Sequence, residues 1–347
     1  MYEPKTLFVV GAGASQEAGL PTGNELTATI AEKVDIKFRN YNEQYSGELE
    51  IAAALRFQAR NVDGTRGDIN PYLNACWHIR DAMPQAISID SFIDHQGDDK
   101  IELCGKLAIV RSILEAEKNS LLFVDERQDQ TTINFNALEK TWYKIFMQIL
   151  SDGCHRKNIN QIFEGVSFIV FNYDRCIEHF LFHALQNYYG IQSDEAADIL
   201  QELTIIHPYG MVGRLQWQGD GGDTRFGTNA DGEQLLSLVG QIKTYTERIE
   251  DEKVTEAIRQ LLGYAKTVMF LGFSFHGLNM KLIKPSRTSS KRVFATAKGM
   301  SDSDCDIIVQ QIVDLFDEKT RNISVYLKNG LTCRGLFEEY LRSLSRS

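Results

Sequence analysis

Residues Thr6 to Gly23, TLFVVGAGASQEAGLPTG, contain the pattern from which the fold can be argued. Thr6 to Val10 is a short apolar run rich in β-branched residues, typical of a strand that is covered on both faces. It leads directly into Gly11-Ala12-Gly13. Because glycine has no Cβ and tolerates unusual backbone angles, a pyrophosphate can approach the N–H groups of such a loop and the N-terminus of the next helix. The stretch therefore predicts a strand, a phosphate-binding loop and a dinucleotide ligand.

The loop departs from the usual dinucleotide fingerprint G-x-G-x-x-G. That fingerprint would place glycine at Gln16 and an acidic ribose-binding residue about 20 residues later. Here Ser15 follows the glycines, and Gly19 to Gly23, which includes Pro21 and Thr22, contains too many helix-breaking residues for a regular helix. A tight turn that binds no ligand is the alternative interpretation.

The composition is that of an ordinary globular protein. The 347 residues are 43% hydrophobic and 24% charged, and no apolar run approaches the length of a membrane span. The chain passes straight into its first strand, so we expect no signal peptide. Six scattered cysteines without a C-x-x-C pair disfavour structural zinc and disulfides and favour a reducing cytoplasm. The net charge of −10 argues against direct binding of nucleic acid over a wide surface.

The rest of the chain predicts an α/β fold with a helical insertion. Residues 24–159 show helical spacing of apolar residues, and we interpret them as a helical module inserted after the first strand. Strands and helices then alternate, and the predicted strands are Ser167 to Phe171, Leu203 to Ile206, Thr267 to Leu271, Arg292 to Ala295 and Ile323 to Leu327. This order predicts a doubly wound, mostly parallel, Rossmann-like sheet formed by residues 1–23 and 160–347. Within the module, Ser88 or Asp90 is expected to cap a helix, and the alternative for Asp90 is a place on the wall of the cleft.

Three further motifs follow predicted strands, at the edge where an open α/β sheet binds its ligand. The stretch FNYD, Phe171 to Asp174, offers an amide and a carboxylate that suit a ribose hydroxyl, a water and a carboxamide, or a plain helix cap. The stretch HPYG begins at His207, whose side chain can exchange a proton near neutral pH, although a lone histidine is more often structural. The stretch GFSFHG, Gly272 to Gly277, offers a glycine and a hydroxyl for a phosphate or ribose, or a simple turn into a helix.

These pieces together resemble a known family. GAGAS, AGLPTG, FNYD, HPYG and GFSF occur in this order between Leu7 and Asn279, and the combination is similar to the sirtuin fold family. The resemblance is to its bacterial sirtuin-like branch, which includes NAD⁺ hydrolases of anti-phage defence. It implies a glycine loop that holds the NAD⁺ phosphates, an asparagine that orients ribose and water, an aspartate that contacts the nicotinamide carboxamide, and a histidine base. The implied catalytic residues are Asn172, His207 and Asp174. The implied NAD⁺-binding residues are Gly11, Ala12, Gly13, Ser15, Thr22, Asp174, Gly272, Phe273 and Ser274, and no metal is implied.

Two departures from the family pattern refine the expected activity. Protein-deacylating sirtuins commonly carry a four-cysteine zinc module, which the scattered cysteines here cannot build, and this favours hydrolysis of NAD⁺. Such sirtuins also tend to have adjacent His and Gly, whereas Pro208 and Tyr209 intervene here, so the pose of His207 can differ. The sequence therefore predicts a NAD⁺ glycohydrolase that releases nicotinamide and ADP-ribose. The alternatives are a sensor or scaffold subunit that binds NAD⁺ or ADP-ribose without turnover, and a NAD-dependent protein deacylase.

The predicted activity also implies a regulator. A cytoplasmic enzyme that consumes NAD⁺ must be gated, and we find no sensor pattern in this sequence. Defence proteins of the resembled branch carry a fused sensor or act beside a separate protein such as a HerA-type ATPase or a short Argonaute. We therefore expect a homo-oligomer that meets a HerA-like ATPase in trans and neither spans a membrane nor binds nucleic acid by itself. The candidate contacts are the last predicted helix around Phe337 and Tyr340 or the apolar helix faces of the insertion, and burial in the core is the alternative for each.

Overall fold

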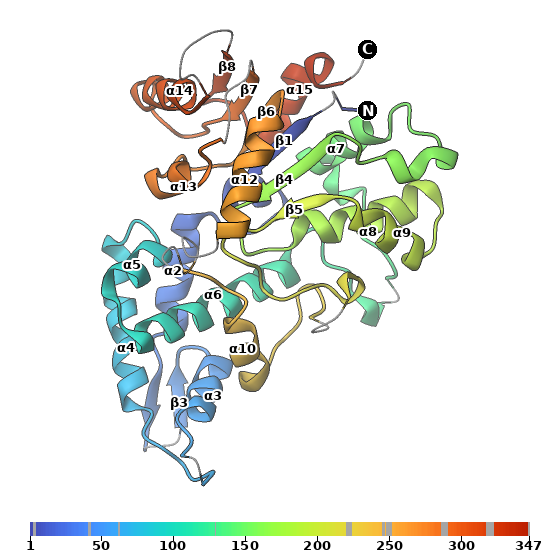
Figure 1. Ribbon diagram of the computed structural model, residues 1–347. Coiled ribbons are helices and arrows are strands. Elements are labelled where there is room, and N and C mark those ends of the chain that lie inside the picture. Colours follow the sequence, from blue (N-terminus) through green and yellow to red (C-terminus); the bar gives the residue numbers. More distant parts are fainter. Residues whose placement is uncertain are drawn as a thin grey trace.

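The computed structural model describes the chain except residues 3–4, 41–42, 62, 129, 220–223, 245–246, 248–251, 286–290, 317–322 and 346–347. Its centre is a six-stranded sheet in the order β5-β4-β1-β6-β7-β8, with every neighbouring pair parallel (Figure 1). The strands are β1 (Thr6–Val10), β4 (Val166–Val170), β5 (Thr204–Ile206), β6 (Thr267–Leu271), β7 (Lys291–Thr296) and β8 (Ile323–Lys328). The predicted doubly wound α/β fold is confirmed, and the order of connection reverses between β1 and β6.

Both faces of the sheet are covered, because side chains alternate across each strand. Leu7 and Val9 of β1 belong to one hydrophobic cluster, and Phe8 and Val10 belong to the other. The first face is covered by α12 (Glu252–Tyr264), α13 (Gly277–Leu282), α14 (Asp302–Phe316) and a helical lobe. The second face is covered by α7 (Trp142–Ser151), α8 (Cys176–Tyr189), α9 (Ser193–Gln201) and α15 (Cys333–Leu344).

The helical lobe occupies the lower part of Figure 1. Its helices are α2 (Gly23–Lys33), α3 (Leu49–Gln58), α4 (Asn70–Ala82), α5 (Ile89–Gln96) and α6 (Asp99–Asn119). They are joined by α10 (Gly232–Val239), which comes from the connection between β5 and β6, and by the hairpin of β2 (Lys37–Arg39) and β3 (Glu43–Ser46). The module limits expected from the sequence, residues 24–159, thus include α7, a helix that packs on the sheet beside α15.

A buried ion pair fastens the lobe to the sheet. Glu117 near the end of α6 and Arg175 before α8 both have fully buried side chains, and Arg175 Nε donates to Glu117 Oε1 at 3.0 Å. Burial raises the pKa of Glu117, and the guanidinium of Arg175 opposes that shift. Glu117 also accepts the Gly227 N–H at 3.0 Å, and Arg175 donates to the Thr224 carbonyl at 2.7 Å. The pair thereby holds Arg175, which directly precedes α8 and is two residues after Tyr173, against the lobe.

The last helix is part of the core. Phe337 of α15 is fully buried, and its ring stacks on Trp142 of α7 with centroids 5.8 Å apart. Tyr340 packs on Phe294 and Tyr326 of the sheet. The candidate contact surface around Phe337 is therefore wrong, and the alternative of burial in the core is confirmed.

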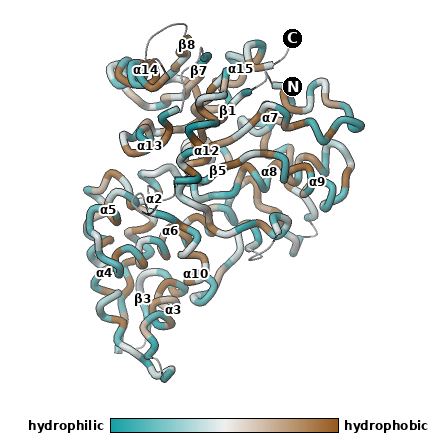
Figure 2. The backbone as a smooth tube through the Cα atoms, viewed as in Figure 1, coloured by the Kyte–Doolittle hydropathy of each residue, from teal (hydrophilic) through white to brown (hydrophobic). Residues whose placement is uncertain are grey.

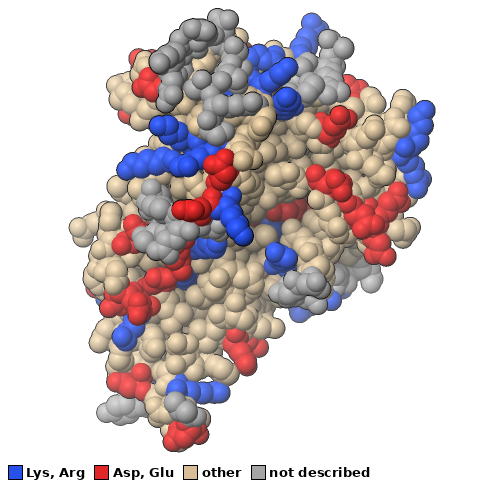
Figure 3. Space-filling model, viewed as in Figure 1, with Lys and Arg blue, Asp and Glu red and all other residues tan. Residues whose placement is uncertain are grey.

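Hydrophobic residues are concentrated in the central sheet (Figure 2), and charged residues of both signs lie on the surface (Figure 3). Figure 2 shows hydrophobic residues, in brown, recurring along the central strands and alternating with hydrophilic ones on the surrounding helices. In the part of the chain that the structure describes, no helix combines the length and the apolar character needed to cross a bilayer. On the face seen in Figure 3, described Lys and Arg side chains are interspersed with groups of Asp and Glu.

Candidate active site

The carboxyl ends of the parallel strands meet at one edge of the sheet, and a cavity of about 650 Å³ opens there. Its size is within the range of small-molecule sites. One wall consists of the loops that follow β1, β4, β6 and β7, and the facing wall includes the first turn of α5. Among the residues predicted from the sequence, the cavity is lined by Gly11, Ala12, Gly13, Thr22, Asn172, Gly272, Phe273 and Ser274. Residues predicted from the ends of three strands, β1, β4 and β6, thus come together in one place.

Gly11 and Gly13, in the loop after β1, pack against Gly272, in the loop after the neighbouring strand β6. A Cβ on Gly11 would lie 2.6 Å from the Gly272 carbonyl oxygen, and one on Gly272 would lie 2.0 Å from Ala14 N. Gly272 also has a φ of 55°, in the left-handed region that favours glycine. Gly11 N–H donates to the Leu271 carbonyl at 2.9 Å, and Gly13 N–H donates to the Gly272 carbonyl at 3.0 Å. Two N–H groups expected to face a pyrophosphate therefore bond within the protein, and these glycines are required by the close contact of the loops.

Asn172 is held in place by a short hydrogen-bond chain. Its Nδ2 donates to Ser15 Oγ at 3.1 Å, and Ser15 Oγ donates to Asp174 Oδ2 at 2.9 Å. The other oxygen of Asp174 accepts the Cys176 N–H at 3.1 Å, at the start of α8. Ser15 and Asp174 are buried behind the cavity wall, and of the three only Asn172 lines the cavity. Because Nδ2 donates to Ser15, Asn172 Oδ1 is the atom that can accept from a molecule in the cavity.

His207 also lies behind the wall. Its Nε2 lies 2.7 Å from Glu178 Oε1, and its Nδ1 lies 3.1 Å from the Asn172 carbonyl oxygen. The Asn172 carbonyl only accepts, so Nδ1 donates to it, and the carboxylate of Glu178 favours a proton on Nε2 as well. Burial lowers the pKa of His207, but the charge and hydrogen bond of Glu178, together with the Asn172 carbonyl, outweigh it and the pKa is raised. The histidine therefore supports the backbone at Asn172 and does not reach the cavity in this conformation.

Asp90 does not have the role first expected of it. The helix cap of α5 is Ser88, whose Oγ accepts the Ser91 N–H at 3.1 Å, so the cap prediction is confirmed for Ser88 and wrong for Asp90. Asp90 lines the cavity, as its alternative interpretation held, and its Oδ1 accepts a hydrogen bond from the Tyr173 hydroxyl. Burial raises the pKa of Asp90, and the Tyr173 hydroxyl opposes that shift.

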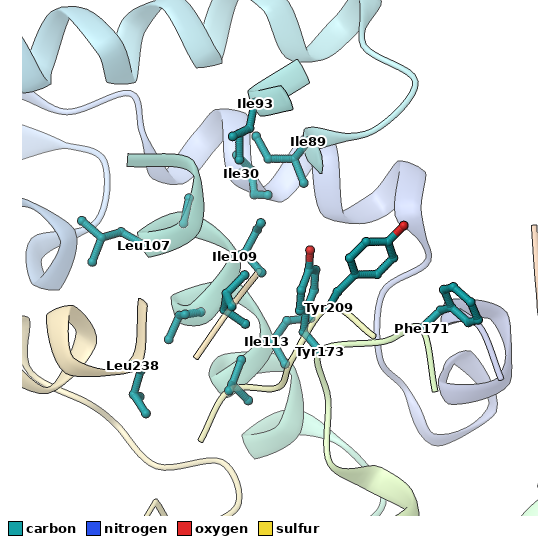
Figure 4. Packing of buried hydrophobic residues seen from close by; sticks show 14 of the residues in the cluster. Ile30, Ile89, Ile93, Leu107, Ile109, Ile113, Phe171, Tyr173, Tyr209 and Leu238 are labelled. Carbon is teal, nitrogen blue, oxygen red and sulfur yellow. The ribbon is translucent and has the colours of Figure 1, made fainter. Parts of the chain in front are cut away.

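Aromatic side chains fill the space between the strand ends and α5. Figure 4 shows the rings of Tyr173 and Tyr209 side by side, with their hydroxyl oxygens on the side of Ile89. Phe171 packs edge-on against Phe273, with centroids 5.1 Å apart. Tyr209 O–H donates to Asn279 Oδ1 at 2.7 Å, and this links the HPYG turn to α13, the helix that follows the GFSFHG motif.

Sequence reasoning missed the partners that reach these motifs from other elements. Glu178 lies in the first turn of α8, and no sequence spacing indicates its contact with His207, 29 residues further along the chain. The contact between Asp90 and Tyr173 joins residues 83 apart in the chain, and no sequence spacing indicates it.

Comparison with known proteins does not identify a family: no protein-family model matches the chain, and no curated protein matches it. Within the described residues, no group of three or more His, Cys, Asp and Glu side chains is placed to hold a metal ion.

Proposed function

We propose that this protein is a NAD⁺ glycohydrolase that cleaves the bond between nicotinamide and ribose. The observation that carries the proposal is the amide of Asn172, held by Ser15 and Asp174, in a cavity built from glycine loops at the reversal point of a doubly wound sheet. Open α/β sheets bind nucleotides at that point. The sirtuin-like order of the motifs supports the choice of NAD⁺ as substrate.

The proposed chemistry uses the fixed orientation of the Asn172 amide. Cleavage of a glycosidic bond passes through an oxocarbenium-like transition state, which requires a fixed ribose and a positioned water. Asn172 Oδ1 accepts from that water or from a ribose hydroxyl, while Ser15 keeps the amide from rotating. Asp174 acts through Ser15, and its proposed contact with the nicotinamide carboxamide would require it to leave that partner. The proposed chemistry uses no metal.

The base role of His207 is the part of the proposal that demands a rearrangement. An imidazolium with two hydrogen-bonded N–H groups has no lone pair with which to take a proton, so the ring must first release one proton. That same observation favours a second candidate, in which the protein binds NAD⁺ or ADP-ribose without turnover. His207→Ala distinguishes the two candidates if binding and cleavage of NAD⁺ are both measured. A base is needed for cleavage alone, so the variant of a glycohydrolase should still bind NAD⁺ and lose its cleavage.

Incubation of the purified chain with NAD⁺ tests the proposal. Nicotinamide and ADP-ribose are quantified by chromatography with and without an acetylated peptide, and ADP-ribose binding is measured by calorimetry. Release of nicotinamide without peptide supports the glycohydrolase. Binding with no release, both alone and with the ATPase proposed below, supports the sensor or scaffold, and release only with peptide supports the deacylase. An active-site Asn172→Ala variant excludes a contaminating enzyme.

We also propose that the activity serves anti-phage defence in the cytoplasm, as a homo-oligomer gated in trans by a HerA-like ATPase. The argument is that uncontrolled loss of NAD⁺ would kill the host cell. Light scattering on the isolated chain, followed by NAD⁺ assays with and without the ATPase, tests both parts. A monomer that cleaves NAD⁺ at full rate with nothing added would contradict them.

A further inference from the structure

The cavity contains a carboxylate that the chemistry above does not use. Asp90 is the second residue of α5, and it lines the same cavity as Asn172 although it comes from the helical lobe. Its Oδ1 accepts from the hydroxyl of Tyr173, the residue next to Asn172. The hydrogen bond therefore fixes Asp90 relative to the strand end that carries the proposed reacting group.

Two other carboxylates at or directly behind the cavity wall, Asp174 and Glu17, are already bonded at both oxygens. Asp174 accepts from Ser15 and from the Cys176 N–H. Glu17 lines the cavity, but its oxygens accept the Trp142 N–H at 2.7 Å and the Arg334 N–H at 2.9 Å. A carboxylate accepts through both of its oxygens, so Asp90 can meet a ligand with Oδ2 while Oδ1 stays with Tyr173.

We propose that Asp90 is a second catalytic residue of this site. Its carboxylate accepts a hydrogen bond from a hydroxyl of the nicotinamide ribose and stabilises the positive charge that develops on that ribose. The inference rests on the proposed NAD⁺ glycohydrolase function. In the reaction, the bond between C1′ and the nicotinamide nitrogen breaks, and its electron pair leaves with neutral nicotinamide. The oxygen of water bonds to C1′ and releases one proton, which the proposed base His207 passes to the solvent, so Asp90 neither gains nor loses a covalent bond.

The carboxylate is placed for this task by its surroundings. Charge stabilisation is stronger in a partly dehydrated site than in water, and Asp90 is partly buried beside aromatic rings. Tyr173 lowers the cost of keeping this carboxylate charged by donating to Oδ1. Tyr173 is thus a positioning residue, because it acts on the substrate only through Asp90.

Asp90→Asn tests the proposal, because it keeps the shape and an acceptor for Tyr173 and removes the charge. We expect kcat/KM for NAD⁺ to fall by about 100-fold or more, mainly in kcat, since the interaction strengthens in the transition state. The affinity for ADP-ribose, whose ribose is uncharged, should change by less than about tenfold. Asp99→Asn, an exposed carboxylate at the start of α6, is the matched control and should keep wild-type kinetics.

Two results of this experiment would overturn the inference. One is a kcat/KM of the Asp90→Asn variant within about threefold of the wild type. The other is a loss of ADP-ribose affinity as large as the loss of kcat/KM, which would make Asp90 a binding residue only. A wild-type chain that releases no nicotinamide, whether alone or with the HerA-like ATPase, defeats the proposed function itself, and the catalytic role with it, whereas an active wild type with an active variant defeats the inference alone.

Tyr173→Phe provides a second readout. The reaction needs Asp90 as a carboxylate, so activity falls as the pH falls through its pKa. Deprotonation of His207 gives a separate acid limb, and the limb that belongs to Asp90 is the one that the Asp90→Asn variant lacks. Removal of the hydroxyl that lowers this pKa should move the acid limb of kcat to higher pH. The other titratable groups that line the cavity are Glu17, Tyr209, His276, Lys298 and Cys333, and Glu247 lies near Tyr173. These groups remain in the variant, so an acid limb that does not move would contradict the role of Tyr173.

Discussion

The two walls of the cavity are built in different ways. At the strand-end wall, the backbone at Gly11 and Gly13 is in direct contact with the backbone at Gly272. A Cβ added to any of these glycines would overlap the other loop. At the α5 wall, Asp90 meets the strand ends through one side-chain hydrogen bond to Tyr173. Contacts between backbones specify the position of a loop rigidly, because backbone atoms cannot move without the strands that carry them. The strand-end wall should therefore determine whether the site forms, and the α5 wall should affect mainly the activity of the formed site.

Gly272→Ala should have the largest effect, because it breaks the strand-end wall. The new Cβ would lie 2.0 Å from Ala14 N at a residue with a φ of 55°. We expect the free energy of unfolding to fall by about 4 kcal/mol, from backbone strain and overpacking together. Denaturant titration measures it. Gly240→Ala is the control, since its Cβ would meet no atom within 4 Å and its φ is −65°. Equal stability of the two variants would remove the distinction between the walls.

Asn172→Ala changes the residue of the strand-end wall next to Tyr173, through which the two walls are joined. We expect NAD⁺ cleavage to fall by about 100-fold or more, which corresponds to about 2.7 kcal/mol of transition-state stabilisation. The fold should remain, because the side chain lines the cavity and fills no core. Asn187→Ala, at an exposed position near the end of α8, is the matched control. A normal turnover of the Asn172→Ala variant, measured as nicotinamide release, would exclude Asn172 from the chemistry.

Glu178→Gln tests the layer behind the strand-end wall. Glu178 contributes to the raised pKa of His207, so the pair adds stability below the ordinary histidine pKa of 6.5 and loses it as the pH rises through the folded-state value. The variant should lower the free energy of unfolding by about 2 kcal/mol at about pH 6. The difference from the wild type should shrink at higher pH. Denaturant titrations across pH measure it, and a difference that grows with pH would contradict the assigned imidazolium.

Ser88→Ala should have the smallest effect, because it loosens only the α5 wall. Loss of the cap that accepts the Ser91 N–H should cost about 1 kcal/mol, and hydrogen exchange should locate the change in α5. NAD⁺ cleavage should fall more than after Ser193→Ala, an exposed control at the start of α9. Faster exchange spread over β1 and β6 would show that the two walls are not independent.

The sheet could be predicted because its strands are apolar runs followed by glycine or polar residues. Thr267–Leu271 is the strand expected from the sequence, and it is buried along its whole length. The hairpin of β2 and β3 was missed because these strands are short and partly exposed, and lack a continuous apolar run. The helix α10 was not predicted, because it is only eight residues long and begins at Gly232, the last residue of a glycine-rich stretch.

By itself, the sequence determined the parallel sheet and the gathering of its polar strand-end motifs at one edge, because parallel strands all present their carboxyl ends on the same side. Only the tertiary structure decided which of those side chains face the cavity. Asn172 faces it, whereas His207 is turned to Glu178 and Asp174 to Ser15. Asp90 lies in α5, and the argument from the ends of parallel strands does not extend to residues of that helix. The reason is that a side chain's direction depends on the partners that satisfy its hydrogen bonds, and these partners lie far apart in the chain.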